Sequence, residues 1–275
     1  MWTTSNKQYW ETSYIMEEFI SNNILKQLPE PPQIAVILGS GLSNFSDNLE
    51  KRIIIPYSQI EGYPQPSIRG HLGEFVFGYS CNIPVICARG RFHFYEGHPL
   101  NIVTLPIRVF SDLGCEYVII TNAAGCLREE WNLGELMLIK GHMDYTFSQE
   151  NRTPRVVLGT EYYDAGLIGK TKQVSKMNRM TVREGIYCWT MGPSFETPAE
   201  IKEIKKLGGD AVGMSTVPEI RQAHDLKLKT LGISCLTNYA AGITNQPLCH
   251  AEVLETTNRI KDEFASLIMG IITSI

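Results

Sequence analysis

The stretch Ile34-Ala35-Val36-Ile37-Leu38 is followed directly by Gly39-Ser40-Gly41. Five consecutive apolar residues that stop at a glycine are typical of a strand that is buried on both faces and enters a tight turn. Such a strand belongs inside a sheet that is covered on both sides. The turn then presents the hydroxyl group of Ser40 and its neighbouring amides at the carboxyl end of the strand.

Further strands and helices alternate along the chain. Short apolar runs predict strands at about residues 74–77, 84–88, 116–121, 136–139, 185–191, 210–212 and 228–236. Apolar residues at helical spacing predict helices at about residues 14–28, 102–113, 198–207, 217–226 and 250–271. This alternation predicts an α/β fold with a largely parallel central sheet flanked by helices.

The size of the chain favours one domain over residues 1–275, with 43% hydrophobic residues to fill a single core. The N-terminal helix at about 14–28 belongs to this domain. Periodicity is weakest from Asp144 to Arg179, which is a candidate surface loop or lid. No linker, repeat or low-complexity tract divides the sequence.

Charge and cysteine content exclude several classes of protein. The net charge of -4 gives no support for a nucleic-acid partner. No apolar run approaches the length needed to span a membrane. The seven cysteines are odd in number and include no Cys-x-x-Cys pair, which argues against disulfides and zinc and favours a reducing compartment. We therefore expect a cytoplasmic enzyme or binding protein.

Polar and aromatic residues alternate in the stretch from Arg91 to Tyr95. Alternation of Arg91, His93 and Tyr95 with two phenylalanines predicts a short extended run, with the aromatic rings toward the core and the polar groups together on the other face. The planar guanidinium fork matches phosphate or carboxylate. Taken alone, the pattern indicates either an anion site or a half-buried strand with a solvated polar face.

The other polar positions are ambiguous one by one. The turn at Ser40 lacks the third glycine of a dinucleotide-binding turn, because Asn44 stands there, so it is either a plain turn or a phosphate-binding nest. In Gly192–Thr197, Phe195 and Glu196 could stack on a flat ring and accept a hydrogen from its edge, or Thr197 could simply cap the next helix. Ligands of open parallel sheets bind beyond the carboxyl ends of strands. Five candidates follow predicted strands: Ser40, Asn122, Phe195, Met214 and Asn238.

Motifs for metal or hydrolytic chemistry are missing from the sequence. The six histidines show no His-Glu-x-x-His spacing, and no Gly-x-Ser-x-Gly elbow is present. We therefore expect neither a metal nor an organic cofactor.

Seven motifs, in this order from about Gln33 to the C-terminus, resemble the trimeric type of purine nucleoside phosphorylase, a family that also includes the methylthioadenosine phosphorylases. The matching motifs are Gly39-Ser40-Gly41-Leu42, Gly70-His71-x-Gly73, Gly90-Arg91-x-His93-x-Tyr95-Glu96-Gly97, Thr121-Asn122-Ala123-Ala124-Gly125, Gly192-Pro193-Ser194-Phe195-Glu196-Thr197, Val212-Gly213-Met214-Ser215-Thr216-Val217-Pro218-Glu219 and Thr237-Asn238.

This resemblance implies a mixed, distorted and partly barrel-like sheet flanked by helices, and a homotrimer. It also implies phosphorolysis of purine ribo- and deoxyribonucleosides to the free base and (deoxy)ribose 1-phosphate in purine salvage, with inorganic phosphate as co-substrate. Phosphate would be bound by Ser40, His71, Arg91, His93, Ala123 and Ser215. Ribose would be bound by Tyr95, Met214 and His250. The base would be bound by Phe195, Glu196, Val212 and Asn238. The catalytic residues would be His93, Glu196 and Asn238.

The base-binding pair predicts a substrate preference. Glu196 can accept a hydrogen bond from the N1–H group of guanine or hypoxanthine, which adenine lacks, and Asn238 can donate to N7 or O6. The methylthioadenosine branch carries aspartate at the position of Asn238, so we expect inosine and guanosine to be preferred. The alternatives are a relative that prefers xanthosine or methylthioadenosine, a hydrolytic nucleosidase, or a catalytically silent purine- or phosphate-binding protein.

The sequence departs from the family at three places, one of which is His224 and Asp225 near a predicted helix end. Cys126 replaces the usual glycine after Asn-Ala-Ala-Gly, which adds a side chain beside the predicted phosphate loop. Residues 143–182 match poorly and form a divergent loop region. The family draws from it a phenylalanine that reaches the neighbouring subunit's ribose, and no residue of this chain is assigned that role.

Overall fold

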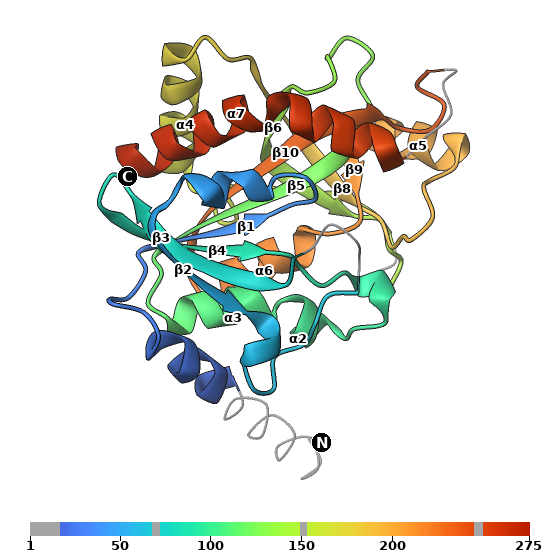
Figure 1. Cartoon of the computed structure of the whole chain (residues 1–275). Coiled ribbons are helices and arrows are strands. Elements are labelled where there is room, and N and C mark those ends of the chain that lie inside the picture. Colours follow the sequence, from blue (N-terminus) through green and yellow to red (C-terminus); the bar gives the residue numbers. More distant parts are fainter. Residues whose placement is uncertain (1–16, 68–71, 149–152, 245–249) are drawn as a thin grey trace.

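The computed structural model describes residues 17–67, 72–148, 153–244 and 250–275, without the side chains of His250 and Ala251. Within these residues, a ten-stranded sheet runs in the order β10-β6-β8-β9-β5-β1-β4-β3-β2, with β7 paired to β6 (Figure 1). The strands are β1 (Ile34–Leu38), β2 (Glu50–Pro56), β3 (Glu74–Ser80), β4 (Ile83–Arg89), β5 (Tyr117–Cys126), β6 (Leu136–Asp144), β7 (Val156–Leu158), β8 (Val182–Trp189), β9 (Ala211–Gly213) and β10 (Lys229–Tyr239). The α-helices are α2 (Leu100–Val103), α3 (Leu105–Asp112), α4 (Ala165–Met177), α5 (Pro198–Lys206), α6 (Val217–Asp225) and α7 (His250–Ser274), and the 3-10 helices are η1 (Ser43–Asn48), η2 (Tyr57–Gln59) and η3 (Phe94–Glu96).

Strand β1 lies in the middle of the sheet, as its apolar run predicts. All five of its residues are buried, and it pairs in parallel with β4 on one side and β5 on the other. A strand with sheet neighbours on both edges and helices over both faces has no solvated side, so every position is apolar.

The sheet closes on itself at one end. Strand β10 pairs with β5 and β6, β8 pairs with β6 and β9, and β9 returns to β5, which makes a ring of five strands. Parallel and antiparallel pairs both occur in this ring, and β1, β4, β3 and β2 extend from β5 as an open sheet. The expected mixed, partly barrel-like sheet flanked by helices is confirmed.

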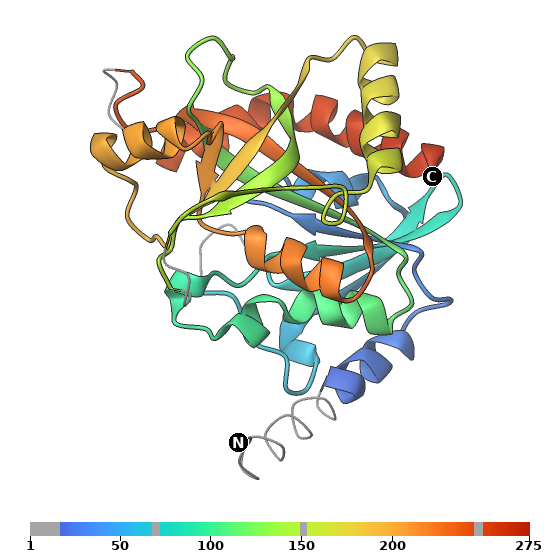
Figure 2. The same cartoon turned by 180° about the vertical axis from the view of Figure 1, so that it is seen from behind.

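Helices cover both faces of the sheet (Figures 1 and 2). Helices α7 and α4 pack together over one face, where residues such as Leu167, Phe264 and Ile268 form one core with β1 and β10. Helices α3 and α6 lie next to each other over the opposite face. Residues 17–25 form the described part of the predicted N-terminal helix, and Ile20 and Ile24 join this second core. None of the helices in the described ranges is long and apolar enough to cross a membrane.

The expectation of a loop from Asp144 to Arg179 is wrong over much of that stretch, which contains β7 and the helix α4. Asp164 caps α4 by accepting a hydrogen bond from the Leu167 amide at 2.8 Å. The buried positions of α4 are Leu167, Thr171, Val174 and Ser175. Two of these four carry hydroxyl groups, so the apolar stripe that marks a helix is weak in the sequence.

The stretch from Arg91 to Tyr95 is not a strand. Strand β4 ends at Arg89, Gly90 has a φ of 136°, and η3 begins at Phe94. Phe92 is buried as expected, but Phe94 is only half-buried. The chain therefore bends after β4. The period-two pattern correctly predicted the burial of Phe92 but not that of Phe94.

Two predicted strand ends are also displaced. Strand β5 continues to Cys126 and β10 to Tyr239, so Asn122 and Asn238 lie within strands and not after them. Both strands are paired through these residues, because β10 pairs with β5 from Lys229 to Tyr239. The small residues of Ala123-Ala124-Gly125 thus belong to a strand whose backbone is close to the site.

Candidate functional site

A pocket of about 190 Å³ opens where the carboxyl-terminal parts of β1, β5, β9 and β10 meet the segments that follow β4 and β8. Every predicted site residue whose side chain is described lines it. These residues are Ser40, Arg91, His93, Tyr95, Ala123, Phe195, Glu196, Val212, Met214, Ser215 and Asn238. His71 and the side chain of His250 lie outside the described part of the structure.

Asn122, a candidate from its place near the end of a predicted strand, also lines the pocket. The other lining residues had no predicted role. They are Ala124, Gly125, Pro193, Gly213, Thr237, Ala240 and Val253. Most of them lie beside a predicted site residue in the same motif. Their position next to a candidate, as a small residue or one with a hydroxyl group, is the feature of the sequence that could have identified them. Val253 comes from α7, within the helix predicted at about residues 250–271. Cys126 is buried, donates to the carbonyl of Arg128 at 3.3 Å and is not among the lining residues.

Close packing places the Ser40 turn. A Cβ atom at Gly39 would lie 2.7 Å from Cα of Asn122, and the Gly39 amide donates to Oγ1 of Thr121 at 3.1 Å. Gly41 has a φ of 75°, and a Cβ atom there would overlap Thr257 of α7. Glycine is therefore required on both sides of Ser40, because the turn is pressed between β5 and α7.

Among the described residues that line the pocket, Arg91 is the one lysine or arginine. It is 2% exposed. Its Nε donates to Glu219 at 3.1 Å, and its Nη1 donates to the Thr121 carbonyl at 2.8 Å and to Ser215 Oγ at 3.2 Å. Its Nη2 is buried without a hydrogen-bond partner among the described residues. A buried donor without a partner is costly, so this nitrogen is the one left to bind an anion.

Ser215 is held at the start of α6 by a constrained backbone. Thr216 has a φ of 79°, a conformation that a threonine adopts rarely, and the Val217 amide donates to the Ser215 carbonyl at 2.9 Å. Nδ2 of Asn122 donates to Thr216 Oγ1 at 3.0 Å, which ties this turn to β5. The amino end of α6 therefore faces the same region as Arg91, and its dipole favours negative charge there.

His93 is oriented by Glu96. Oε1 of Glu96 accepts from the His93 amide at 2.7 Å and lies 3.2 Å from its Nδ1, and Oε2 accepts from the Ser67 amide at 3.0 Å. Burial alone raises the pKa of Glu96, but these hydrogen bonds from His93 and Ser67 outweigh it and bring the pKa to about 2. The carboxylate is therefore charged and fixes the imidazole.

Tyr95 stacks on His93, with ring centroids 4.8 Å apart and planes 19° apart. Burial, aided by Glu96, raises the pKa of Tyr95 to about 12, so the phenol keeps its proton at neutral pH. Gly192 lies close by, and a Cβ atom there would be 2.5 Å from the sulfur of Met214 and 2.8 Å from the Tyr95 ring. Tyr95 and Met214 therefore form one continuous wall.

The other end of the pocket carries an aromatic ring, a carboxylate and an amide. Phe195 is 45% exposed and Asn238 is 5% exposed. Burial raises the pKa of Glu196, although its hydrogen bond from Thr190 acts in the opposite direction. Thr197 also caps α5 through a capping box, so the structural alternative considered for this loop holds together with the pocket-lining position of Glu196.

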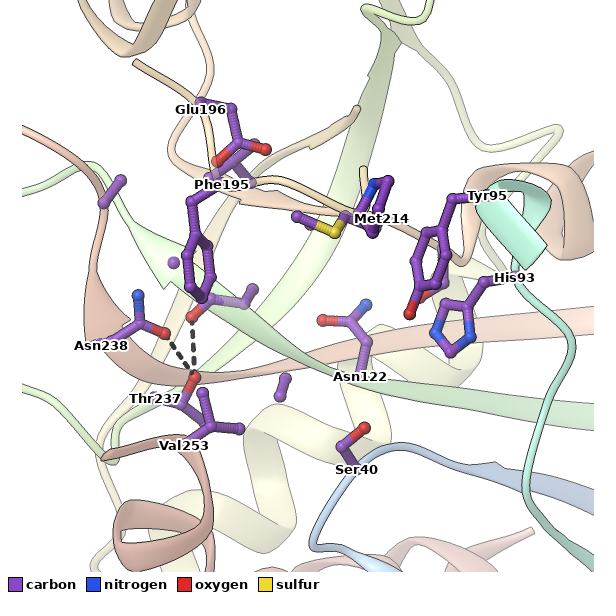
Figure 3. Close-up of a pocket in the computed structure, with 18 of the residues that line it drawn as sticks. Ser40, His93, Tyr95, Asn122, Phe195, Glu196, Met214, Thr237, Asn238 and Val253 are labelled. Carbon is purple, nitrogen blue, oxygen red and sulfur yellow. Dashed lines mark hydrogen bonds between the residues drawn. The ribbon is translucent and has the colours of Figure 1, made fainter. Parts of the chain in front are cut away.

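Figure 3 shows how these groups are arranged. Phe195, Glu196 and Asn238 lie on one side of the pocket, His93 and Tyr95 lie on the opposite side, and Met214 lies between them. Ser40 and Asn122 form part of the wall below. The pocket thus has an end with Phe195, Glu196 and Asn238 that suits a flat ring with polar edges, and Tyr95 lies on the opposite side. Arg91 and Ser215, which are hydrogen-bonded to each other, supply donors that suit an anion.

Metal-ligating side chains do not gather in the described ranges: no group of three or more His, Cys, Asp or Glu residues there could hold an ion. The expectation of no metal and no cofactor stays a prediction.

Residues 33–273 match the family described as the phosphorylase superfamily. A purine nucleoside phosphorylase 1 of Geobacillus stearothermophilus is 42% identical over 257 residues, which cover 91% of this chain and 94% of the relative. The crystal structure of Schistosoma mansoni purine nucleoside phosphorylase in complex with inosine matches with a TM-score of 0.85 and 31% identity, over 94% of this chain and 96% of that one. Isoform 2 from the same organism, in complex with cytosine and ribose-1-phosphate, matches with a TM-score of 0.86 and 31% identity, over 95% and 97% of the two chains.

Proposed function

Because the chain belongs to the phosphorylase superfamily, we propose that it cleaves the glycosidic bond of purine nucleosides with inorganic phosphate. The products are the free base and ribose or deoxyribose 1-phosphate. The names of the relatives support this activity, and so does the binding of inosine and ribose-1-phosphate by the similar structures.

One observation supports the proposal most directly. Arg91 is buried, with one nitrogen that has no hydrogen-bond partner among the described residues, in the same pocket that holds Phe195, Glu196 and Asn238 at its other end. A protein that binds only phosphate does not need Phe195, Glu196 and Asn238. A protein that binds only a purine does not need the buried Arg91. The pocket combines both and has Tyr95 and Met214 between them for a sugar.

The chemistry follows from this order of groups. An oxygen of the bound phosphate forms a bond to C1′ of the sugar while the bond from C1′ to N9 of the purine breaks, and the electron pair of that bond goes to the base. The sugar passes through a cationic, oxocarbenium-like state, which a nearby negative phosphate stabilises. Asn238 stabilises the departing base by donating to N7 or O6. Because phosphate is the nucleophile, the step requires no enzyme carboxylate pair.

The roles of the individual residues are part of the proposal. Ser40, His71, Arg91, His93, Ala123 and Ser215 bind phosphate, and Tyr95, Met214 and His250 bind the sugar. Phe195 and Val212 contact the base, Glu196 accepts from its N1–H group and Asn238 donates to its other edge. This pair favours inosine and guanosine over adenosine, since adenine offers no hydrogen at N1.

Assembly and location are proposed on the family resemblance. We expect a homotrimer in the cytoplasm, acting in purine salvage with neither metal nor cofactor, and the net charge of -4 argues against nucleic acid as a partner. Light scattering of the purified protein tests the trimer, and dialysis against a chelator followed by an activity assay tests the absence of a required metal.

The function is tested by following inosine with and without phosphate. We expect hypoxanthine and ribose 1-phosphate only when phosphate is present, and Arg91→Ala is expected to raise the phosphate concentration needed. Cleavage without phosphate would indicate a hydrolase. Binding of hypoxanthine without any cleavage would indicate a silent binding protein, and faster cleavage of adenosine, methylthioadenosine or xanthosine would indicate a different base preference.

A further inference from the structure

Glu219 lies behind the pocket and has no role in the function proposed above. It is on the first turn of α6 and is 1% exposed. Its Oε1 accepts a hydrogen bond from Nε of Arg91 at 3.1 Å, and it is not among the residues that line the pocket. A carboxylate so deeply buried is costly unless it is paired, so its contact with Arg91 demands an explanation.

The hydrogen bonds of Arg91 show what Glu219 does to it. Three acceptors hold two of the three guanidinium nitrogens: Glu219 at Nε, and the Thr121 carbonyl and Ser215 at Nη1. Only Nη2 is left without a partner among the described residues, in a side chain that lines the pocket. The three contacts therefore fix the plane of the fork and leave one nitrogen for a ligand.

Glu219 also changes the charge of the site. Among the lining residues that the structure describes, Arg91 is the one lysine or arginine. Its positive charge is paired with the Glu219 carboxylate. The second oxygen of that carboxylate, Oε2, is buried without a hydrogen-bond partner among the described residues. The pair is formally neutral. Phosphate bound at Nη2 accepts a strong, directional hydrogen bond, but the Arg91–Glu219 pair that donates it carries little net positive charge.

We propose that Glu219 is a positioning residue that orients Arg91 and offsets its charge, so that bound phosphate keeps the negative charge that stabilises the cationic sugar. This inference rests on the proposed function. A bare arginine would bind phosphate more tightly but would neutralise it. Glu219 therefore favours turnover at the expense of phosphate affinity, since only interactions stronger in the transition state raise the rate.

The test is Glu219→Gln, which keeps the acceptor oxygen near Arg91 and removes the charge. With inosine as substrate, we expect the KM for phosphate to fall by about threefold or more, because the attraction of Arg91 is no longer offset. We expect kcat to fall by about tenfold or more, because the phosphate charge is now partly neutralised. A higher KM for phosphate with unchanged kcat, or no change in either, would overturn the inference.

A matched control is available two residues before Arg91. Arg89 is 6% exposed and pairs with Glu74 at 3.0 Å, and neither residue lines the pocket. Glu74→Gln makes the same substitution beside another buried arginine, which keeps a second carboxylate partner in Asp47. We expect it to lower the melting temperature without altering kcat or the KM for phosphate, so equal effects of both variants on the KM for phosphate would contradict a role specific to Glu219.

A second variant and a binding measurement keep this test separate from that of the proposed function. Glu219→Asp retains the charge and shortens the reach, so we expect phosphate to bind about threefold or more weakly, with an unchanged Kd as the contrary result. If Glu219→Gln does not fold, Glu219→Asp still tests whether Glu219 orients Arg91. If the wild-type protein fails to cleave inosine with phosphate, the proposed function fails. Calorimetric titration with inorganic phosphate still tests the charge effect, which requires tighter binding by Glu219→Gln than by the wild type.

Discussion

The hydroxyl group of Thr237 donates a hydrogen bond to Oδ1 of Asn238 at 2.9 Å (Figure 3). This contact is shorter than the 3.4 Å from the same hydroxyl to the Ala124 carbonyl, and together with the Tyr239 carbonyl it sets which end of the amide accepts and which end donates. Nδ2 of Asn238 donates one of its hydrogens to the carbonyl of Tyr239 at 3.1 Å, which leaves the second hydrogen for a ligand. The pocket therefore presents an amide donor beside Phe195 and Glu196.

Thr237→Val tests this orientation. Valine has the same shape without the hydroxyl, so only the Tyr239 carbonyl still holds the Asn238 amide and the donor is positioned less firmly. We expect kcat/KM for inosine to fall by about tenfold, which corresponds to the loss of one hydrogen bond. Thr237→Ser keeps the hydroxyl and is expected to retain most of the activity. Equal losses in the two variants would mean that the methyl group, and not the hydrogen bond, is what matters.

Asn238→Asp should change the preferred base. A carboxylate accepts from the 6-amino group of adenine and repels the O6 atom of hypoxanthine, and the Thr237 hydroxyl can still donate to it. We expect the ratio of kcat/KM for adenosine over inosine to rise by about tenfold or more. Steady-state rates with both nucleosides at saturating phosphate measure this ratio. An unchanged ratio would remove the proposed role of Asn238.

Glu196 should give the reaction an acid limit above that of an ordinary glutamate. Burial raises its pKa from 4.5, so as the pH falls the group takes up a proton sooner and stops accepting from N1–H. We expect kcat/KM for inosine to decline on the acid side with a midpoint above 4.5. In Glu196→Gln the rate should be lower and this decline should be absent. Phosphate titrates equally in both proteins, so the ratio of the two pH profiles isolates Glu196, and a flat ratio would contradict the prediction.

His142 should make stability depend on pH. It is fully buried on β6, its Nδ1 lies 2.8 Å from the Tyr163 hydroxyl, and burial, aided by the charge of Arg221, lowers its pKa from 6.5 to about 4. Between these values the unfolded chain binds a proton that the folded chain does not. The free energy of unfolding therefore falls as the pH falls from 6.5 to about 4, with a loss of up to about 3 kcal/mol when complete.

Urea unfolding at pH 7 and pH 5 measures this effect. We expect the drop in stability between these two pH values to be smaller by about 2 kcal/mol in His142→Gln than in the wild type. Tyr163→Phe removes the hydrogen bond but keeps the histidine, so it should lower stability at both pH values and retain the pH dependence. An identical drop in His142→Gln and the wild type would show that His142 does not titrate as its burial predicts.

Local patterns in the sequence correctly predicted the elements whose burial is uniform. The run from Ile34 to Leu38 is the fully buried β1, and the apolar stripe of α7 packs as expected. The prediction of secondary structure failed in α4, where some of the buried positions are occupied by residues with hydroxyl groups. In α4, Thr171 is buried yet bonds to the carbonyl of Leu167 at 2.7 Å within its own helix, so its polarity costs little and its sequence resembles that of a loop.

The sequence by itself determined the layered α/β fold and placed several candidates at predicted strand ends, because burial and turn chemistry act over a few residues and leave patterns in them. The complete set of candidate site residues came from the ordered motifs that resemble a known family. Only the tertiary structure decided which of those residues touch. Arg91 and Glu219 are 128 positions apart, and their hydrogen bond depends on α6 packing against the end of β4. The same holds for the closure of β10 onto β5 and β6, which brings Asn238 to the pocket. Contacts of this kind are set by packing between distant elements, and no spacing within one segment can encode them.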